Sequence, residues 1–246
     1  MHLYGLIGMP LSQSFSKKYF TEKFERENIR DTAYELFPLE NISLLTDLLA
    51  SHPGLRGLNV TIPYKEQVLP FLHTVSDDAG EIAAVNCIKI GNSGLLKGFN
   101  TDAPAFKSSL LPLLQSHHKK ALVLGTGGAA KAVLHVLKSL GIEYAFVSRS
   151  KGAGFTYEEL NRSIVEAYPL IINSTPLGSF PKVDTAPAIP YEYLGSKNYL
   201  YDLVYNPSKT LFLQKGEEQG ASIKNGYEML VGQAELSWQI WNDNTL

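Results

Sequence analysis

The chain has 246 residues, of which 44% are hydrophobic and 19% charged, a composition typical of a globular protein with a substantial core. The formal net charge of -2, with both signs scattered, excludes a basic face for nucleic acid or for an anionic membrane. The single cysteine, Cys87, excludes an internal disulfide and a thiolate zinc site, and the six histidines lack partners at ligand spacing. We therefore expect a small-molecule partner and no metal, nucleic acid or membrane.

The first ten residues, MHLYGLIGMP, contain one short apolar cluster without a basic leader, and no later run reaches membrane-spanning length. Together with the low cysteine content, this predicts a cytoplasmic protein.

Apolar segments rich in β-branched and aromatic residues alternate with helical patterns along the chain. In order they are LYGLIG, YELFPL, LRGLNVT, AVNCIKI, ALVLG, YAFVS, LIINST and YLYDLVY. Amphipathic helices are predicted between Ser16 and Asn28, from near Asp102, and after Gly226. Because a polar stretch precedes the strand that opens at Ala121, we expect two α/β units with largely parallel sheets.

The segment ALVLGTGGAAKAVLHVLKSLG has the pattern of a strand, a glycine turn and a helix. Gly125, Gly127 and Ala130 match the G-x-G-x-x-G/A fingerprint, in which a tight turn lets a pyrophosphate approach the backbone at a helix N-terminus. The segment therefore predicts a dinucleotide site. The alternative is a glycine-rich turn that binds nothing.

The end of the next predicted strand, FVSRSKG, indicates which dinucleotide is bound. Here Arg149 lies between Ser148 and Ser150, where an NAD site usually carries a carboxylate. A guanidinium and hydroxyl groups attract a 2′-phosphate, which a carboxylate would repel, so NADP is the predicted cofactor. The alternative is that Arg149 lies in solvent and only caps a loop.

Several apolar strands of the first hundred residues end in polar side chains. In LNVTIPYK, Asn59 and Thr61 face the same side, and the turn that follows can bring Lys65 over the strand end. The segments GMPLSQSFS, AAVNC and GFNTD add Ser14, Ser16, Asn86, Asn100, Thr101 and Asp102. A set of mostly neutral donors and acceptors suits a small polyhydroxylated ligand, although each residue alone could serve a turn or cap.

Lys65 and Asp102 are the oppositely charged pair among these clusters. If the two side chains meet, the carboxylate would hold the ammonium in place, and the pair would handle a proton. The alternative is a structural salt bridge at the domain junction.

Eight separated motifs together resemble one family. SQSFS, NVTIPYK, AVNCI, NTDA, GTGGAAKAV, NSTPLG, YDLVYNP and GYEMLVGQA are similar, in order and spacing, to those of shikimate dehydrogenases over nearly the whole chain. The resemblance implies NADPH-dependent, reversible reduction of 3-dehydroshikimate to shikimate, on the route to chorismate and the aromatic amino acids. It also implies two domains: a substrate domain of residues 1–101 with about 226–246, and a Rossmann-like doubly wound NADP domain of residues 102–225. The C-terminal helix would return to the first domain, and the protein would be a monomer or homodimer.

The resemblance also assigns roles to individual residues. Ser14, Ser16 and Tyr205 would hold the substrate carboxylate, and Lys65 and Asp102 would be the catalytic pair. The ligands of the ring hydroxyls would be Asn59, Thr61, Asn86, Asp102 and Gln233. The cofactor would contact Gly125, Thr126, Gly127, Gly128, Ala129, Ser148, Arg149 and Ser150, with Thr175, Leu203, Gly226 and Met229 at its nicotinamide end.

Some positions depart from the family pattern, and two other functions compete. Lys17 replaces a frequent proline, Ala84 replaces a usual glycine, and Ser-Arg-Ser replaces Asn-Arg-Thr. One alternative is a quinate/shikimate dehydrogenase with relaxed cofactor use; retention of Ser14 and Thr61 favours shikimate. The other is a catalytically silent regulator that binds NADPH or a shikimate-like ligand, which we would expect to lack Lys65 or Asp102.

Overall fold

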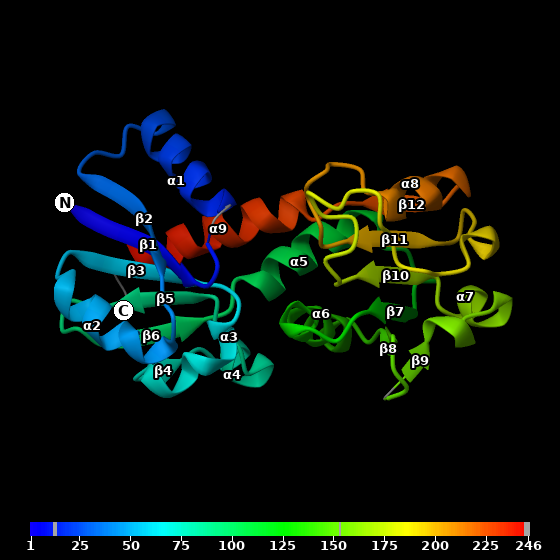
Figure 1. Ribbon diagram of the computed structural model, residues 1–246, viewed down its shortest axis with the longest axis horizontal. Coiled ribbons are helices and arrows are strands. Elements are labelled where there is room, and N and C mark those ends of the chain that lie inside the picture. Colours follow the sequence, from blue (N-terminus) through cyan, green and yellow to red (C-terminus); the bar gives the residue numbers. More distant parts are fainter. Residues whose placement is uncertain (12–13, 153, 244–246) are drawn as a thin grey trace. The chain divides into compact units, whose positions relative to one another are not determined.

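The computed structural model describes residues 1–11, 14–152 and 154–243, and the chain folds into two compact units (Figure 1). The first unit contains Met1–Thr101 and the chain from Ala234 onward, and the second contains Asp102–Gln233. Each unit is a sheet covered by helices, which confirms the predicted α/β fold. No helix in the described part of the chain has the length and hydropathy needed to cross a membrane.

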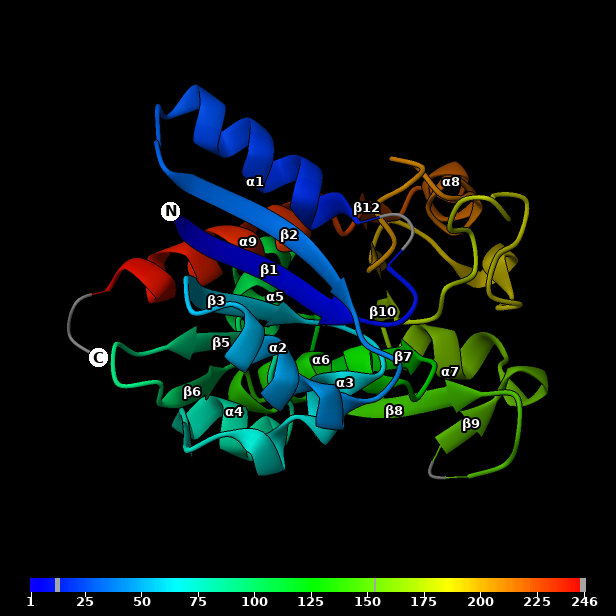
Figure 2. The same ribbon diagram turned by 60° about the vertical axis from the view of Figure 1, so that its left-hand side comes forward.

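The sheet of the first unit is mixed. Its strand order is β2 (Thr32–Pro38), β1 (His2–Gly8), β3 (Leu55–Val60), β5 (Cys87–Ile90), β6 (Leu96–Phe99) and β4 (Thr74–Val75). β1 lies parallel to β2 and β3, between them (Figure 2), whereas β5 is antiparallel to β3 and β6. Because β4 is also parallel to β6, the expectation of a largely parallel sheet is confirmed. The antiparallel pair of β5 and β6 arises because the short turn between Ile90 and Leu96 reverses the chain, whereas a parallel connection needs a dozen residues or more.

Two hydrophobic cores lie on the two faces of this sheet. Tyr4 and Leu6 of β1 pack with helix α1 (Phe15–Arg26) and with α9 (Tyr227–Asn242), as predicted for amphipathic helices at these places. Ile7 of β1 belongs to the other core. That core includes residues of α2 (Leu45–Ser51), α3 (Tyr64–Gln67) and α4 (Asp77–Ile82). Successive residues of a strand point to opposite faces, so one strand serves both cores.

The sheet of the second unit has the doubly wound order. Its strands follow as β9 (Gly154–Thr156), β8 (Glu143–Ser148), β7 (Lys120–Leu124), β10 (Leu170–Asn173), β11 (Tyr199–Asp202) and β12 (Ser222–Lys224), and all the pairs are parallel. The helices are α5 (Asp102–Leu110), α6 (Gly128–Ser139), α7 (Arg162–Ala167) and α8 (Leu211–Glu218), with short 3-10 helices at Ile42–Leu44, Leu69–Phe71, Leu111–Leu113, Tyr157–Glu159 and Tyr191–Tyr193 along the whole chain. The order reverses between β7 and β10, where doubly wound sheets bind their ligands.

The connection from β8 to β9 is unusually short for parallel strands. Residues 149–153 join them, and the described residues among these form no helix, whereas such crossovers normally contain one. β9 therefore pairs only with the last three residues of β8, and Thr156 lies opposite Ser148. The two neighbouring strands therefore end side by side, and Arg149 and Tyr157 are the first residues after them.

Helix α9 begins in the second unit and ends in the first. In the first unit, the ring of Trp241 stacks on Tyr4 at 4.9 Å, and its indole nitrogen donates to the carbonyl of Ile88 at 3.0 Å. A Cβ at Gly57 would lie 2.3 Å from the Trp241 ring, so the helix packs against bare backbone there. The last helix is therefore part of the first core.

Candidate active site

The predicted glycine turn connects β7 to α6. Gly125 has a φ of +94°, and a Cβ there would lie 2.8 Å from the Thr175 side chain, so glycine is required. Gly127 is the N-cap of α6 and provides no side-chain cap, and the first turn of the helix carries no acidic residue. The amide groups of this turn therefore present a positive helix end to an anion.

A cavity of about 430 Å³ opens at this turn, at the switch point between β7 and β10. Seven residues predicted to bind the cofactor line it: Gly125, Thr126, Gly127, Ser148, Arg149, Ser150 and Thr175. The sequence interpretation missed Val147, Tyr157, Ser174, Pro176 and Leu177, which also line it. The volume lies within the usual range for small-molecule sites.

The remaining predicted cofactor residues lie outside this lining. Gly128 and Ala129 form the first turn of α6, and Met229 lies in the first half of α9. Gly226 donates its amide to Val204, and a Cβ there would lie 2.2 Å from the carbonyl oxygen of Leu203. Only glycine fits at this crossing of two chain segments. The roles of these residues toward a nicotinamide remain predictions.

A buried polar network supports the floor of the cavity. Asn173 Oδ1 accepts hydrogen bonds from the Thr175 amide at 3.0 Å and hydroxyl at 2.6 Å, and Asn173 Nδ2 donates to Asp202 at 2.9 Å. Asp202 also accepts from the Val204 amide at 3.0 Å and from Thr210 Oγ1 at 2.6 Å. Burial raises the pKa of Asp202, and the three hydrogen bonds offset only part of this effect, so the pKa is about 6. The carboxyl group thus ties the ends of β10 and β11 together.

In the first unit, Asn59 is engaged inside the fold. Its Oδ1 accepts from the Tyr34 hydroxyl at 2.9 Å, and its Nδ2 donates to the Asn86 carbonyl at 3.2 Å and to Ser237 Oγ at 2.8 Å. Both amide hydrogens are therefore used. A ring hydroxyl of a ligand could contact this buried side chain only at the remaining lone pair of Oδ1.

Asn86 differs from Asn59 in this respect. Its Oδ1 accepts from the Thr101 amide at 2.7 Å, and its Nδ2 donates to Thr101 Oγ1 at 2.9 Å. Within the described residues, its second amide hydrogen has no partner. Asn86 is therefore positioned by Thr101 and keeps one donor for a ligand.

The polar residues that follow β3 lie at its carboxyl end. The Thr61 amide donates to Ile7 at the end of β1, and the Thr61 carbonyl accepts from Tyr64, which begins α3. Lys65 lies half-buried in this helix, and its carbonyl accepts from Val85 at 2.8 Å. The strand therefore places Thr61 and Lys65 at the edge where an α/β sheet binds ligands.

The predicted carboxylate-binding serines are at the start of α1. Ser14 is the N-cap, and its hydroxyl accepts from the Lys17 amide at 3.4 Å. The Ser16 hydroxyl is hydrogen-bonded to Tyr34, whose pKa is raised well above its ordinary value by burial and lowered to a smaller extent by this bond. Through Tyr34, Ser16 is connected to Asn59.

Other predicted residues belong to the second unit. Asp102 begins α5, Tyr205 follows β11, and Gln233 lies in α9, with its Nε2 donating to the Leu230 carbonyl at 2.8 Å. Burial raises the pKa of Tyr205. Lys65 and Asp102 belong to different units, so their pairing remains a prediction.

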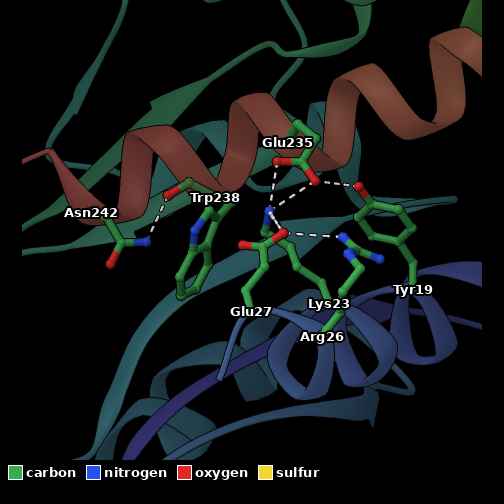
Figure 3. A network of polar contacts seen from close by, with 7 residues as sticks. All are labelled: Tyr19, Lys23, Arg26, Glu27, Glu235, Trp238 and Asn242. Carbon is green, nitrogen blue, oxygen red and sulfur yellow. Dashed lines mark hydrogen bonds and ion pairs between the residues drawn. The ribbon is translucent and has the colours of Figure 1, made fainter. Parts of the chain in front are cut away.

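Ser237 and Glu235 of α9 are structural residues that the sequence interpretation missed. Ser237 is fully buried and lies four residues after Gln233, and that helical spacing was the available signal. Figure 3 shows Glu235 accepting from the Lys23 ammonium, at 2.8 and 3.0 Å, and from the Tyr19 hydroxyl. These contacts fix α9 to α1 beside the predicted substrate residues.

Sequence comparison identifies the family. Residues 6–88 match the shikimate dehydrogenase substrate binding domain. A shikimate dehydrogenase (NADP(+)) of Clostridium beijerinckii is 37% identical to this chain, over 99% of the chain and 93% of that protein. One from Caldanaerobacter subterraneus subsp. tengcongensis is 36% identical, over 97% and 91%. The chain belongs to the shikimate dehydrogenase family.

A solved member of the shikimate dehydrogenase family has the same architecture. The shikimate 5-dehydrogenase of Thermus thermophilus, determined in complex with NADP(H) and shikimate, matches with a TM-score of 0.85 at 29% identity. The match covers 98% of this chain and 94% of that one. The fold predicted from the shikimate dehydrogenase motifs is thus confirmed.

Proposed function

We propose that this protein is an NADP-dependent shikimate dehydrogenase that reversibly reduces 3-dehydroshikimate to shikimate. The observation that carries the proposal is the similarity to relatives named shikimate dehydrogenase (NADP(+)) over 97% to 99% of the chain. A cytoplasmic location in aromatic amino acid biosynthesis is part of the proposal.

The cavity of the second unit fits NADP. The Gly125 turn leaves room for backbone approach, and the N-terminus of α6 offers uncapped amides to a pyrophosphate. The guanidinium of Arg149 is exposed at the cavity and, among the described residues, makes no hydrogen bond or ion pair. When bound, NADPH supplies the hydride for the ketone.

The substrate groups in this proposal are the residues that the family motifs assign. Ser14 and Ser16 with Tyr205 hold the carboxylate, and Asn86 and Thr61 with Gln233 hold ring hydroxyls. Lys65 donates a proton or a strong hydrogen bond to the ketone oxygen as it gains charge, and Asp102 orients the ammonium. Asn59 keeps a positioning role, since its amide hydrogens serve Asn86 and Ser237.

The test is turnover of shikimate followed by nicotinamide absorbance, with NADP or NAD and with quinate in parallel. We expect shikimate-dependent reduction of NADP, and a loss of about 10²–10⁴-fold in kcat for K65A because a positioned proton donor contributes about that much. The exposed K18A is the matched control and should keep full activity. Turnover of quinate instead would support the alternative substrate. A shikimate-induced thermal shift without turnover would contradict the proposal and favour a silent binding protein.

A further inference from the structure

At the Arg149 side of the cavity, Tyr157 has a phenolic hydroxyl group that makes no hydrogen bond within the described part of the fold. Tyr157 lines the cavity with Arg149, and its ring packs partly against the core of the second unit. Among the described residues, its hydroxyl has no hydrogen-bond partner. A half-buried phenol normally finds one, so the group is available to a ligand.

The strand register brings Tyr157 beside Arg149. Ser148 and Thr156 are paired as the last residues of the parallel strands β8 and β9, and each is followed by one of the two side chains. Neighbouring strands lie about 5 Å apart. The charge of Arg149 acts on the phenol strongly enough to lower its pKa, although burial outweighs it and raises the pKa overall. The phenol therefore stays protonated and can donate at neutral pH.

Two other side-chain donors near Arg149 are less available to a ligand in the cavity. The hydroxyl of Ser148 donates to the carbonyl of Ser150 at 2.6 Å, so its hydrogen is not available to a phosphate. Lys151 does not line the cavity, and its exposed ammonium lies 3.9 Å from Glu159, which also closes the capping box with Thr156. The donor set at this end of the cavity is reduced to Arg149, the hydroxyl of Ser150 and the phenol.

We infer that Tyr157 is a specificity-determining residue that donates a hydrogen bond to the 2′-phosphate of NADP, beside the Arg149 guanidinium. The inference rests on the proposed use of NADP and adds to it a residue outside the Ser-Arg-Ser segment. A phenol and a guanidinium together hold a dianionic phosphate better than a guanidinium alone, because each charge-assisted hydrogen bond adds to the affinity. An NAD ribose has a neutral 2′-hydroxyl in place of the phosphate, so it forms no charge-assisted hydrogen bond with this phenol.

The experiment measures binding of NADP and NAD to Y157F without substrate, by calorimetry. We expect about tenfold weaker binding of NADP and unchanged binding of NAD, because the variant keeps the ring and loses only the hydroxyl. Adenosine 2′,5′-bisphosphate and AMP, used as fragments, should show the same contrast. Y168F is the matched control: it also loses only a phenolic hydroxyl, and its ring packs against the same core without lining the cavity, so binding of NADP should stay within about twofold of the wild type.

Each outcome decides the inference. Equal weakening of NADP and NAD would mean that the phenol acts through packing and would overturn it, as would unchanged binding of NADP. A Y157F protein with an altered melting temperature and equal losses for both ligands has the same meaning. Because binding is measured without shikimate, failure of the proposed dehydrogenase activity is detected separately, as absent turnover with NADP binding intact.

Discussion

Asp202 is a fully buried carboxyl group that accepts hydrogen bonds from two side chains and one amide, and its environment favours the protonated form. Its pKa is raised from 3.8 to about 6, so the folded state binds a proton more tightly than the unfolded state. The contribution of this group to the free energy of unfolding is therefore greatest below pH 4 and is lost as the pH rises to about 6.

We expect D202N to lack this loss, because its amide carries no charge. Relative to the wild type, its free energy of unfolding should increase between pH 4 and pH 7 by an amount on the order of 3 kcal/mol. Urea denaturation at several pH values measures this difference. The exposed D184N serves as control and should follow the wild-type profile. Parallel profiles for D202N and the wild type would contradict the assignment.

At the scale of elements, the contact between α1 and α9 depends on a nearly buried lysine. Burial alone would lower the pKa of Lys23, but hydrogen bonds and charges from Glu235 and Glu27 raise it overall. The side chain of Lys23 is only 5% exposed, and its ammonium group therefore remains charged between the two helices (Figure 3). Removing one partner leaves part of a buried charge uncompensated.

E235Q should lower the free energy of unfolding by about 2–3 kcal/mol, less than breaking a fully buried pair because Glu27 remains. The matched control is E22Q, whose partner Lys18 is exposed and 3.8 Å away, and it should change stability by less than about 0.5 kcal/mol. Chemical denaturation of both variants provides the comparison. Similar effects for the two would show that the Lys23 contact does not hold the helices together.

At the scale of the whole molecule, Trp241 belongs to one core only. It lies in the aromatic cluster of the first unit, with Tyr4 and Phe20, and is not part of the described core of the second unit. W241A should cost about 3–5 kcal/mol in the first unit through the cavity that it leaves. Calorimetry should then show an earlier transition separate from that of the second unit. A single transition shifted as a whole would mean that the two units unfold as one.

The sequence predicted most of this molecule where periodicity was strong and failed where elements were short. The eight apolar segments all contain strands, and the glycine turn lies where the fingerprint places it. The strands β4, β9 and β12 were missed because two or three residues carry too little pattern to detect, and β6 was missed because its four residues, LKGF, include a lysine and a glycine. The positions of Tyr157 beside Arg149 and of Ser237 beside Asn59 were missed because they depend on strand register and on the packing of α9.

The passage of α9 from the second unit into the first has a consequence for synthesis on the ribosome. Residues 102–233 are contiguous, so the second unit is complete before the last turns of α9 emerge. The first unit, although its strands are made first, lacks Trp238 and Trp241 until then. Until then α1 covers only part of that face of its sheet, and in this interval a chaperone would be of use to the chain.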